Sequence, residues 1–426
     1  MHRGKDVSSP VSSPIALYIH LPFCRKRCTY CDFNTYTGLS GLAPAYVGAL
    51  CREIEASGER WNALDVSTIY LGGGTPSLLP LDLLADLFEA AHNGFHISAD
   101  PEITIEANPG TITPAYLRGL HDLGINRLSL GVQSTHGDEL QMLGRIHTWP
   151  DTVRAVESAR KGGFENISFD LMFGLPGQTE GRWEEALRTA LDLYPNHLSL
   201  YGLTLEEETL LARQIADGTL PAPEEECSAA MYELAESMLA GAGFFHYEIS
   251  NWAKSRDRWQ DEKPFSSTWW PDPPDVKAQS SEAISSYVCR HNLTYWRNQP
   301  WLAVGAGAHS WLGGRRWVNV NHPEDYVAAW AGDDLSEIDN LLPACQDVEE
   351  IDKPLEMGEM MMLGLRLAEG VSNRRFESRF GRSLLEVFGC QLENLREQGL
   401  ITWDGSVARL TQPGRLLGNR VFERFI

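Results

Sequence analysis

The sequence predicts an α/β protein, with a partial (β/α)6 TIM-like barrel followed by a helical, winged-helix-like C-terminal domain. Two observations predict this fold class. Short β-rich runs alternate with helical patterns through the first half of the chain, and after about residue 350 helical patterns precede a small hairpin. Repeated β-α units imply parallel strands wound in a right-handed sense. We therefore expect ligands at the carboxyl ends of the strands, where such barrels hold their sites.

Runs rich in Ile, Val, Leu, Phe or Tyr are expected to form the barrel strands. They are IALYIH (15–20), STIYL (67–71), EITIEA (102–107), NRLSLGV (126–132), NISFDLMF (166–173) and HLSLYGL (197–203). Segments with apolar residues at helical spacing separate them, such as PLDLLADLFEAAH (80–92) and RWEEALRTALDL (182–193). These strands and helices supply the β-α units of a partial barrel.

The second half of the chain changes character after about residue 225. A helical stretch (225–242) precedes FHYEISNW, and a polar segment at 254–288 is expected to be an exposed insertion or loop. EMGEMMMLGLRLAEG predicts one helix, SLLEVFGCQLENLREQGLI a second and a third, and TWDGSVARLT a hairpin that turns at Asp-Gly. The expected segments are a tail (1–14), the barrel (15–225), a barrel extension (226–345) that contains the insertion, and the C-terminal domain (346–426).

Charge and composition exclude several classes of protein. A net charge of −22 argues against nucleic-acid binding, which needs clustered Lys and Arg. The C-terminal domain shows no basic stripe, so packing is a better interpretation of its fold than DNA binding. No segment has the 18 or more apolar residues of a membrane span, and no signal peptide is evident. We expect a cytoplasmic protein, or a mitochondrial or plastid one if a leader has been removed.

Three cysteines crowd into CRKRCTYC at the spacing C-x3-C-x2-C: Cys24, Cys28 and Cys31. Thiolates are soft ligands that suit zinc or an iron–sulfur cluster. Three protein ligands on a four-iron cluster leave one iron open for a small molecule. The alternative is a zinc site completed by His20 or a water, and a weaker one is three unrelated thiols. The other cysteines are scattered, which argues against a secreted disulfide framework.

Polar and glycine-rich residues gather at the carboxyl ends of the expected strands. Along the chain they are Cys24, the stretch GGGTP (72–76), Glu106, Gln133 and Asp170. In a parallel barrel these ends share one rim, so we expect the residues to converge there.

Several motifs together resemble a known family. YIHLPFCRKRCTYC followed by LGGGTPSLL resembles the radical S-adenosylmethionine (SAM) superfamily, whose signature is C-x3-C-x2-C. EANPGT, RLSLGVQS, FDLMFGLPGQT, YEISNWA and CRHNLTYW resemble the oxygen-independent coproporphyrinogen III oxidase family and, within it, the branch of HemW-type haem chaperones. The resemblance runs from about residue 15 to about 420 and is interrupted by 254–288.

The resemblance implies a [4Fe–4S] cluster and SAM as cofactors. It implies that Cys24, Cys28 and Cys31 hold the cluster, that the amino and carboxylate groups of SAM chelate the open iron, and that an electron donor reduces the cluster. The SAM-contacting residues it implies are Tyr18, Tyr30, Gly73, Gly74, Thr75 and Glu106, with Gln133, Arg145 and Asp170 matching contacts to a second SAM. Taken singly, each tyrosine has core packing as an alternative role.

Two departures separate this chain from the oxidase. The oxidase carries a further cysteine two residues beyond its third ligand, where this chain has Phe33, and it has a longer N-terminal segment. HNLTYW (291–296) instead matches the H-N-x-x-Y-W of the chaperone branch, which implies haem contact by His291, Asn292, Tyr295 and Trp296. An imidazole can ligate haem iron, and aromatic side chains can cover the porphyrin. A structural His–Asn pair is the alternative, and Cys289 and His309 are weaker haem candidates.

The expected function is therefore a haem chaperone that binds haem and passes it to acceptor proteins of unknown identity. In this hypothesis the cluster and SAM regulate or drive the transfer. The alternative is oxygen-independent coproporphyrinogen III oxidase activity in porphyrin biosynthesis. A third hypothesis, an interaction protein with an empty cluster site, is disfavoured by the intact cysteines and glycines.

Overall fold

The computed structural model describes residues 14–61, 64–254, 287–332 and 342–426. Two compact units share the chain, each built from separate segments. The first comprises Met1–Leu171, Thr204–Ala222 and Pro300–Glu350, and the second Met172–Leu203, Pro223–Gln299 and Ile351–Ile426. The four expected segments stay a prediction. The expected insertion, apart from its ends, and the tail up to residue 13 lie outside the described residues.

The first unit is built on one large sheet. Its strands follow the order β14-β13-β12-β11-β1-β4-β5-β6-β7, and the run from β11 to β7 is parallel. The strands that carry the motifs are β1 (Ile15–Leu21), β4 (Asp65–Gly73), β5 (His96–Ala107), β6 (Arg127–Gln133) and β7 (Asn166–Phe173). All five match predicted strands, and their parallel pairing with helices between them confirms the predicted α/β fold class.

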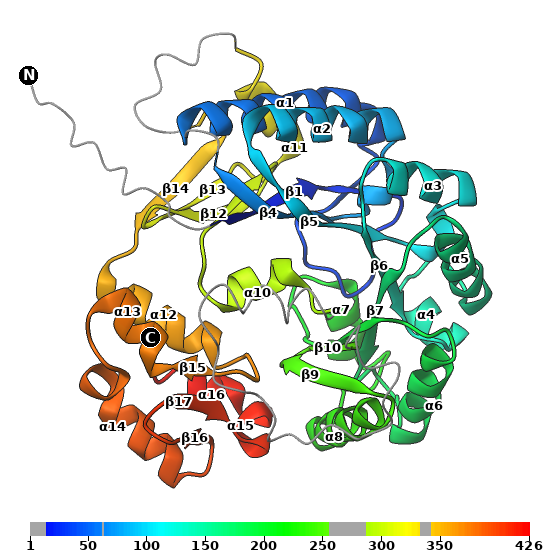
Figure 1. The fold of residues 1–426 in the computed structure, drawn as a ribbon. Helices are drawn as coiled ribbons and strands as arrows, with labels where there is room; N and C mark the ends of the chain where they lie inside the picture. The colour runs from blue at the N-terminus through cyan, green and yellow to red at the C-terminus, as the bar shows by residue number, and fades with distance from the viewer. Residues whose placement is uncertain (1–13, 62–63, 255–286, 333–341) are drawn as a thin grey trace, which may run out of the picture. The chain divides into compact units, whose positions relative to one another are not determined.

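Helices cover the outer face of this sheet. The first two are α1 (Ala43–Arg60) and α2 (Leu81–Gly94), which lie side by side over β1, β4 and β5 in Figure 1. They pack at Gly58 and Gly94, where a Cβ on Gly58 would collide with the Gly94 carbonyl. Because both faces are covered, β1 is a nearly continuous apolar run rather than an alternating one. Farther along lie α3 (Pro114–Asp122), α4 (Gly137–Met142), α5 (Trp149–Lys161) and α7 (Leu210–Ala216).

Distant sequence extends the sheet beyond β1. Strand β11 (Trp301–Val304) runs parallel to β1, and β12 (His309–Leu312), β13 (Arg315–Asn319) and β14 (Cys345–Glu350) continue antiparallel. Helix α11 (Pro323–Ala329) follows β13. The shorter elements of this unit are β2 (Phe23–Cys24), β3 (Tyr36–Thr37), η1 (Ser40–Leu42), η2 (Pro76–Leu78) and η3 (Pro109–Thr111). In the sequence, the cysteine loop follows β1 and precedes β4, and these two strands are paired in the sheet.

The second unit contains the sixth predicted strand, β8 (His197–Gly202). It pairs antiparallel with β10 (Asn251–Lys254), which pairs with β9 (Phe244–Glu248). The helices of this part are α6 (Glu180–Leu191), α8 (Glu225–Gly241) and α10 (Arg290–Trp296). Trp183 of α6 donates from Nε1 to the Met231 carbonyl at 3.0 Å, which fastens α6 to α8.

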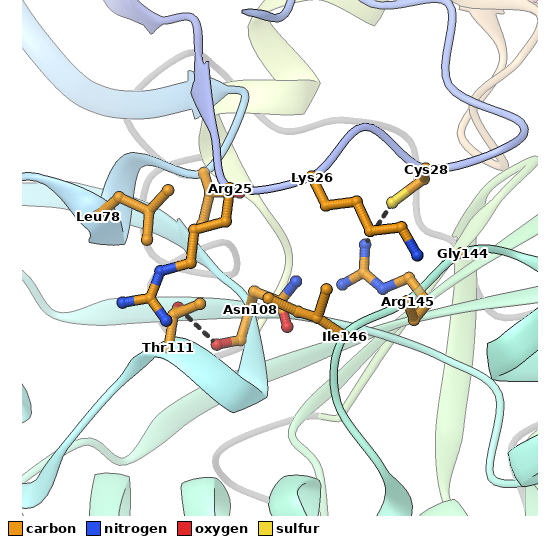
Figure 2. Close-up of a pocket in the computed structure, with 10 residues that line it drawn as sticks. Arg25, Lys26, Cys28, Leu78, Asn108, Thr111, Gly144, Arg145 and Ile146 are labelled. Carbon is orange, nitrogen blue, oxygen red and sulfur yellow. Dashed lines mark hydrogen bonds between the residues drawn. The ribbon is translucent and has the colours of Figure 1, made fainter. Parts of the chain in front are cut away.

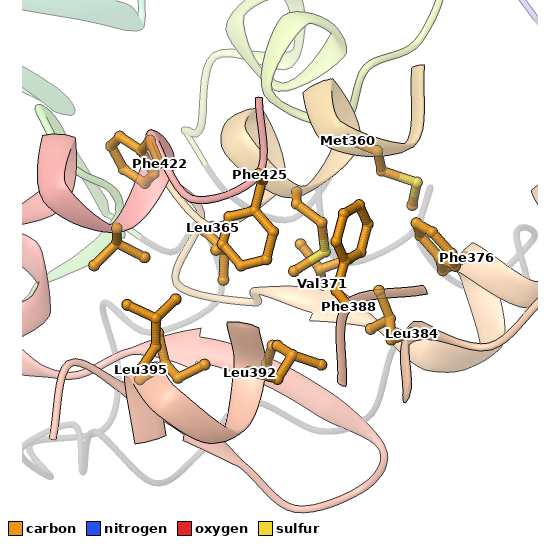
Figure 3. Packing of buried hydrophobic residues seen from close by; sticks show 14 of the residues in the cluster. Met360, Leu365, Val371, Phe376, Leu384, Phe388, Leu392, Leu395, Phe422 and Phe425 are labelled. Atoms are coloured by element: carbon orange, nitrogen blue, oxygen red, sulfur yellow. The ribbon is translucent and has the colours of Figure 1, made fainter. Parts of the chain in front are cut away.

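The C-terminal part of this unit has its own core, shown in Figure 3 around Phe376, Leu392 and Phe425. Its helices are α12 (Lys353–Gly364), α13 (Asn373–Phe380), α14 (Leu384–Glu397), α15 (Gln412–Leu416) and α16 (Gly418–Phe422), and its sheet has the order β15 (Val371–Ser372), β17 (Val407–Leu410), β16 (Ile401–Trp403). The hairpin prediction is confirmed, because β16 and β17 pair antiparallel across Asp404-Gly405. The expected second and third helices are the two parts of α14, which kinks at Phe388.

Helix α13 was not predicted. Its sequence NRRFESRF offers only Phe376 and Phe380 as apolar residues, which is too short a pattern to indicate a helix. Among the described helices, none combines the length and the apolar character that crossing a bilayer requires.

Candidate functional site

The three clustered cysteines lie on the loop that leaves β1. Cys24 ends the short strand β2, and Cys28 and Cys31 follow on the irregular segment behind it. All three are half-buried free thiols. Burial raises the pKa of the Cys24 and Cys31 thiols, so their deprotonation in this loop is favoured only when a cation or donor compensates.

Thr29, between the second and third cysteines, fastens the loop to its surroundings. Its amide donates to the Leu143 carbonyl at 3.1 Å, and its hydroxyl donates to the Met142 carbonyl at 2.8 Å. Its own carbonyl accepts from the Leu211 amide at 2.8 Å. Gly144 lies directly against Thr29, where a Cβ would be 3.2 Å from its amide nitrogen. The loop therefore has a defined path although it has little regular secondary structure.

The alternative role of His20 as a zinc ligand is not supported by its contacts. Its Nε2 lies 2.9 Å from the Asn34 carbonyl, so this nitrogen carries the proton and donates. Its Nδ1 then accepts from the Tyr18 hydroxyl at 3.1 Å. Both ring nitrogens are engaged within the protein. Within the described ranges, no three His, Cys, Asp or Glu side chains are arranged to hold a single metal ion.

A small pocket opens beside the cysteine loop (Figure 2). It is lined by Arg25, Lys26, Cys28, Thr75, Leu78, Asn108, Thr111, Gly144, Arg145 and Ile146. Arg25 and Lys26 are exposed cations, and Thr111 donates to the Asn108 carbonyl at 2.8 Å. The lining combines cations with amide and hydroxyl groups, so the pocket suits a polar ligand that carries a carboxylate.

The glycine stretch after β4 runs against the start of the cysteine loop. The amide of Gly74 donates to the Leu21 carbonyl and that of Thr75 to the Phe23 carbonyl, both at 2.9 Å. Gly73 has a φ of +113°, and a Cβ there would lie 2.5 Å from Cε1 of His20. Position 73 therefore requires glycine on account of the protein itself, in addition to any approach of a ligand.

Glu106 lies at the end of β5 and accepts two hydrogen bonds. The Tyr70 hydroxyl donates to Oε1 at 2.9 Å, and the Gly73 amide donates to Oε2 at 3.1 Å. Burial raises the pKa of Glu106 to about 7, and the charge of Asp170 acts in the same direction, while both hydrogen bonds oppose the shift. The carboxyl is thus close to half-protonated at neutral pH, and a cationic ligand nearby would favour its charged form.

We expect Glu106→Gln to flatten the dependence of stability on pH. In the wild type the folded pKa lies above the unfolded one, so the stabilisation is complete below pH 4.5 and is lost as pH rises through 7. At 1.36 kcal/mol per pKa unit, the loss is at most about 3 kcal/mol. Urea unfolding at pH 5 and pH 8 measures it. Equal losses in the wild type and in Glu106→Gln would contradict the assignment.

Three more predicted residues lie close together along the chain of strands. Gln133 ends β6, Arg145 lies on the segment after α4, and Asp170 lies in β7. Arg145 donates from one guanidinium nitrogen to the Cys28 sulfur at 3.3 Å and from the other to the Gly131 carbonyl at 2.6 Å. Its Nε is buried without a hydrogen-bond partner among the described residues. Asp170 pairs in register with Gly131 and accepts from Ser129 at 3.2 Å.

Gln133 and one further predicted residue, Tyr30, belong to the same part of the site. Gln133 adopts a left-handed φ of +64°, which is uncommon for a residue other than glycine and marks local strain. Burial raises the pKa of the Tyr30 phenol, and the nearby Arg145 opposes this shift. Parallel strands that are neighbours in the sheet thus place the expected rim residues of the first unit. Glu106 lies at the end of β5, Gln133 ends β6 and Asp170 lies in β7.

The HNLTYW motif forms most of helix α10 in the second unit. His291 is only 1% exposed, and its Nε2 lies 2.9 Å from the Tyr295 hydroxyl. Burial lowers the pKa of His291 to about 3, so the imidazole is neutral at physiological pH. Asn292, Tyr295 and Trp296 are half-buried, and the Arg366 guanidinium lies 5.0 Å from the Trp296 ring.

The weaker haem candidates differ in exposure. Cys289 is 2% exposed, and its amide donates to the Tyr247 hydroxyl at 3.3 Å. His309 is an exposed residue at the start of β12 in the first unit. Immediately after the motif, Arg297 forms a paired contact with Glu369, with both N–O distances 2.9 Å. This ion pair fastens the end of α10 to the segment between α12 and β15.

Comparison with known proteins identifies the family. A model of the radical SAM superfamily matches residues 18–190, and one of the HemN C-terminal domain matches residues 351–417. The "Heme chaperone HemW" of Bacillus subtilis (strain 168) is 38% identical over 410 residues, which cover 96% of this chain and 98% of that protein. The chain belongs to the HemW family of radical SAM proteins.

Other similar proteins agree with this HemW-family assignment. The "Radical S-adenosyl methionine domain-containing protein 1, mitochondrial" of Bos taurus is 33% identical over 422 residues, covering 96% of this chain and 87% of that protein. The solved structure of coproporphyrinogen III oxidase (HemN) from Escherichia coli has a TM-score of 0.78 at 23% identity, covering 98% of this chain and 91% of that one. This last likeness concerns the fold.

As a member of the HemW family, the chain takes a [4Fe–4S] cluster and SAM. The residues fit these groups, because three soft thiolate donors lie on one anchored loop and each can ligate a different iron. Donors to an anionic group are offered by the pocket beside Cys28 and by the buried Nε of Arg145, which has no hydrogen-bond partner in the described part of the chain. The zinc alternative and the empty-site alternative are therefore set aside.

Sequence reasoning missed several residues of this HemW-family site. Tyr70 holds Glu106, and its ring stacks on Tyr18 with the centroids 6.1 Å apart. Ser129 holds Asp170, and Thr35 lies beside Cys31. A signal existed for Tyr70 alone, since it stands two residues before the glycine stretch on the same strand.

Proposed function

We propose that this protein is a haem chaperone, which binds haem and transfers it to acceptor proteins. The observation that carries the proposal is the similarity over nearly the whole chain to proteins named haem chaperones. Phe33 supports the choice over the oxidase, because it stands where that family has a further cysteine and its side chain is 64% exposed. The transfer to acceptor proteins and the reduction of the cluster by an electron donor are parts of this proposal.

The HNLTYW helix supplies chemistry suited to haem. A neutral imidazole is the form that ligates iron, and the low pKa of His291 keeps it neutral. Aromatic and apolar groups surround the motif, and Tyr247 and Leu367 form one buried cluster with its Leu293. Since His291 is buried and contacts Tyr295, ligation of haem requires that this contact open. Haem uptake is therefore expected to be slow compared with diffusion.

The radical SAM site has a separate set of tasks. When bound, the cluster and SAM supply one-electron chemistry. The protein's own residues hold and orient these groups. The cysteines carry the cluster, a backbone hydrogen bond from Thr75 holds the glycine stretch against the cysteine loop, and Glu106 ties Gly73 of that stretch to β5. We propose that this site regulates or drives the release of haem. The compartment in which this happens stays a prediction.

We expect His291→Ala to weaken haem binding by roughly tenfold or more, because an axial ligand is lost, and tenfold corresponds to about 1.4 kcal/mol. Titration of haemin with the Soret band as readout measures this. His96→Ala is the matched control, since His96 is exposed, belongs to the first unit and is not a haem candidate. A saturable band that is indifferent to His291→Ala would refute the ligand assignment, and the absence of any saturable band would refute the proposed function.

A comparison of haem uptake with coproporphyrinogen III turnover tests the proposed function itself. Reconstituted protein with SAM and a reductant is offered haem and, separately, coproporphyrinogen III. We expect stoichiometric haem uptake and no protoporphyrinogen. Turnover of coproporphyrinogen III would establish the oxidase alternative instead.

A further inference from the structure

Each sulfur of the cysteine trio faces one side-chain hydrogen-bond donor, and each donor comes from a different segment. The Thr75 hydroxyl lies 3.7 Å from the Cys24 sulfur, and the Thr35 hydroxyl lies 4.0 Å from the Cys31 sulfur. The Arg145 guanidinium donates to the Cys28 sulfur at 3.3 Å. A cysteine that ligates iron is a thiolate and can only accept, so both hydroxyls must then donate.

We propose that Thr75, Arg145 and Thr35 are tuning residues that raise the reduction potential of the iron–sulfur cluster, one for each ligating sulfur. Reduction adds one electron from an external reductant to the cluster and makes its sulfurs more negative. Donors to the sulfurs stabilise this reduced state, and a charged donor does so more strongly. The inference deepens the proposed function because it concerns the same cluster, and it does not depend on haem binding.

Thr35 is held in place from both sides. It is 4% exposed, and its amide donates to the Phe33 carbonyl at 2.7 Å. The preceding residue, Asn34, donates from Nδ2 to the carbonyls of Ala306 and Asn321 at 3.0 and 2.9 Å. Thus the 305–321 segment, far away in the sequence, fixes the backbone that presents the Thr35 hydroxyl.

A buried carboxylate fixes that segment in turn. Glu53 of α1 accepts from the Gly305 amide at 2.8 Å, from Asn319 Nδ2 at 2.6 Å and from the Tyr326 hydroxyl at 2.5 Å. Gly307 faces Asn34, where a Cβ would lie 2.5 Å from Nδ2. Asn34 and Glu53 are therefore positioning residues, which act on the cluster through Thr35.

The test is the midpoint potential of the cluster, measured without SAM by dithionite titration with the electron paramagnetic resonance signal as readout. We expect Thr35→Val and Thr75→Val each to lower the potential, with the reduction constant falling several-fold. Arg145→Leu should lower that constant about tenfold or more, equivalent to about 59 mV for one electron. Thr35→Ser and Thr75→Ser, which keep the hydroxyl, should restore the wild-type potential.

Thr152→Val is the matched control, because Thr152 is fully buried on α5 and its hydroxyl has no hydrogen-bond partner among the residues that the structure describes. Its potential should equal that of the wild type. An unchanged potential in both valine variants would overturn the proposal, as would an equal shift in the control. If a valine variant fails to assemble the cluster, alanine and serine at the same position are compared, and equal potentials for these two would overturn it as well. Haem binding of the same variants, measured in parallel, reports on the proposed function independently.

Discussion

Cys28→Ala is expected to abolish the iron–sulfur cluster, with reconstituted iron falling from about four atoms per chain to less than about one. Two thiolates remain, and the buried guanidinium of Arg145 loses the sulfur to which it donates in the native loop. Both the missing ligand and the positive charge disfavour cluster assembly. Anaerobic reconstitution followed by iron and sulfide analysis measures the loss.

Cys227→Ala is the control for this experiment. Cys227 is also a half-buried free thiol, but it lies on α8 and its sulfur faces the Gln178 carbonyl. We expect its variant to reconstitute like the wild type. Full iron loading of Cys28→Ala would contradict the assignment of the ligands, as would zinc in the oxygen-protected wild type.

Gly73→Ala is expected to cost about 2–5 kcal/mol of folding free energy and to weaken SAM binding by roughly a hundredfold. Its φ of +113° strains any residue with a Cβ, and that Cβ would lie 2.5 Å from His20. The ring cannot easily move, because both its nitrogens are hydrogen-bonded. The Gly73 amide donates a hydrogen bond to Glu106, and this amide would shift with the backbone.

Denaturant unfolding and equilibrium dialysis with SAM measure the two effects. Gly48→Ala is the matched control, since Gly48 is an exposed residue in the middle of α1, and no described residue lies within 4 Å of a Cβ placed there. The same substitution should there stabilise the protein by about 1 kcal/mol, because alanine is the better helix former. If Gly73→Ala had the same free energy of unfolding and the same SAM affinity as the wild type, the glycine stretch would tolerate a side chain and the prediction would be wrong.

The barrel strands could be predicted because each is a contiguous apolar run. A parallel strand covered on both faces must be apolar along its length, and that local signal is strong in IALYIHL and NISFDLMF. The strands β11 and β12 have only four residues each and were not predicted. Strand β11 belongs beside β1 through pairing with residues nearly 300 positions away, for which local sequence offers no signal.

The residues of the site also fall into those that local sequence predicts and those that it does not. Cys24, Cys28 and Cys31 could be predicted as ligands, because soft donors at close spacing are a chemical signal within a few residues. The hydrogen-bond donors to their sulfurs could not. Thr75 and Arg145 are respectively 51 and 117 residues from the cysteines that they contact, and threonine and arginine have many other uses.

The amino-acid sequence alone therefore determined the kind of chemistry: a thiolate trio, a glycine stretch and a histidine motif, each a local pattern of reactive groups. Only the tertiary structure decided the surroundings of those groups, such as the burial of His291 against Tyr295 and the hold of residues 305–321 on Asn34. The reason is physical. Ligand identity depends on the atoms of single residues, whereas burial and hydrogen-bond partners depend on which distant segments the fold brings together.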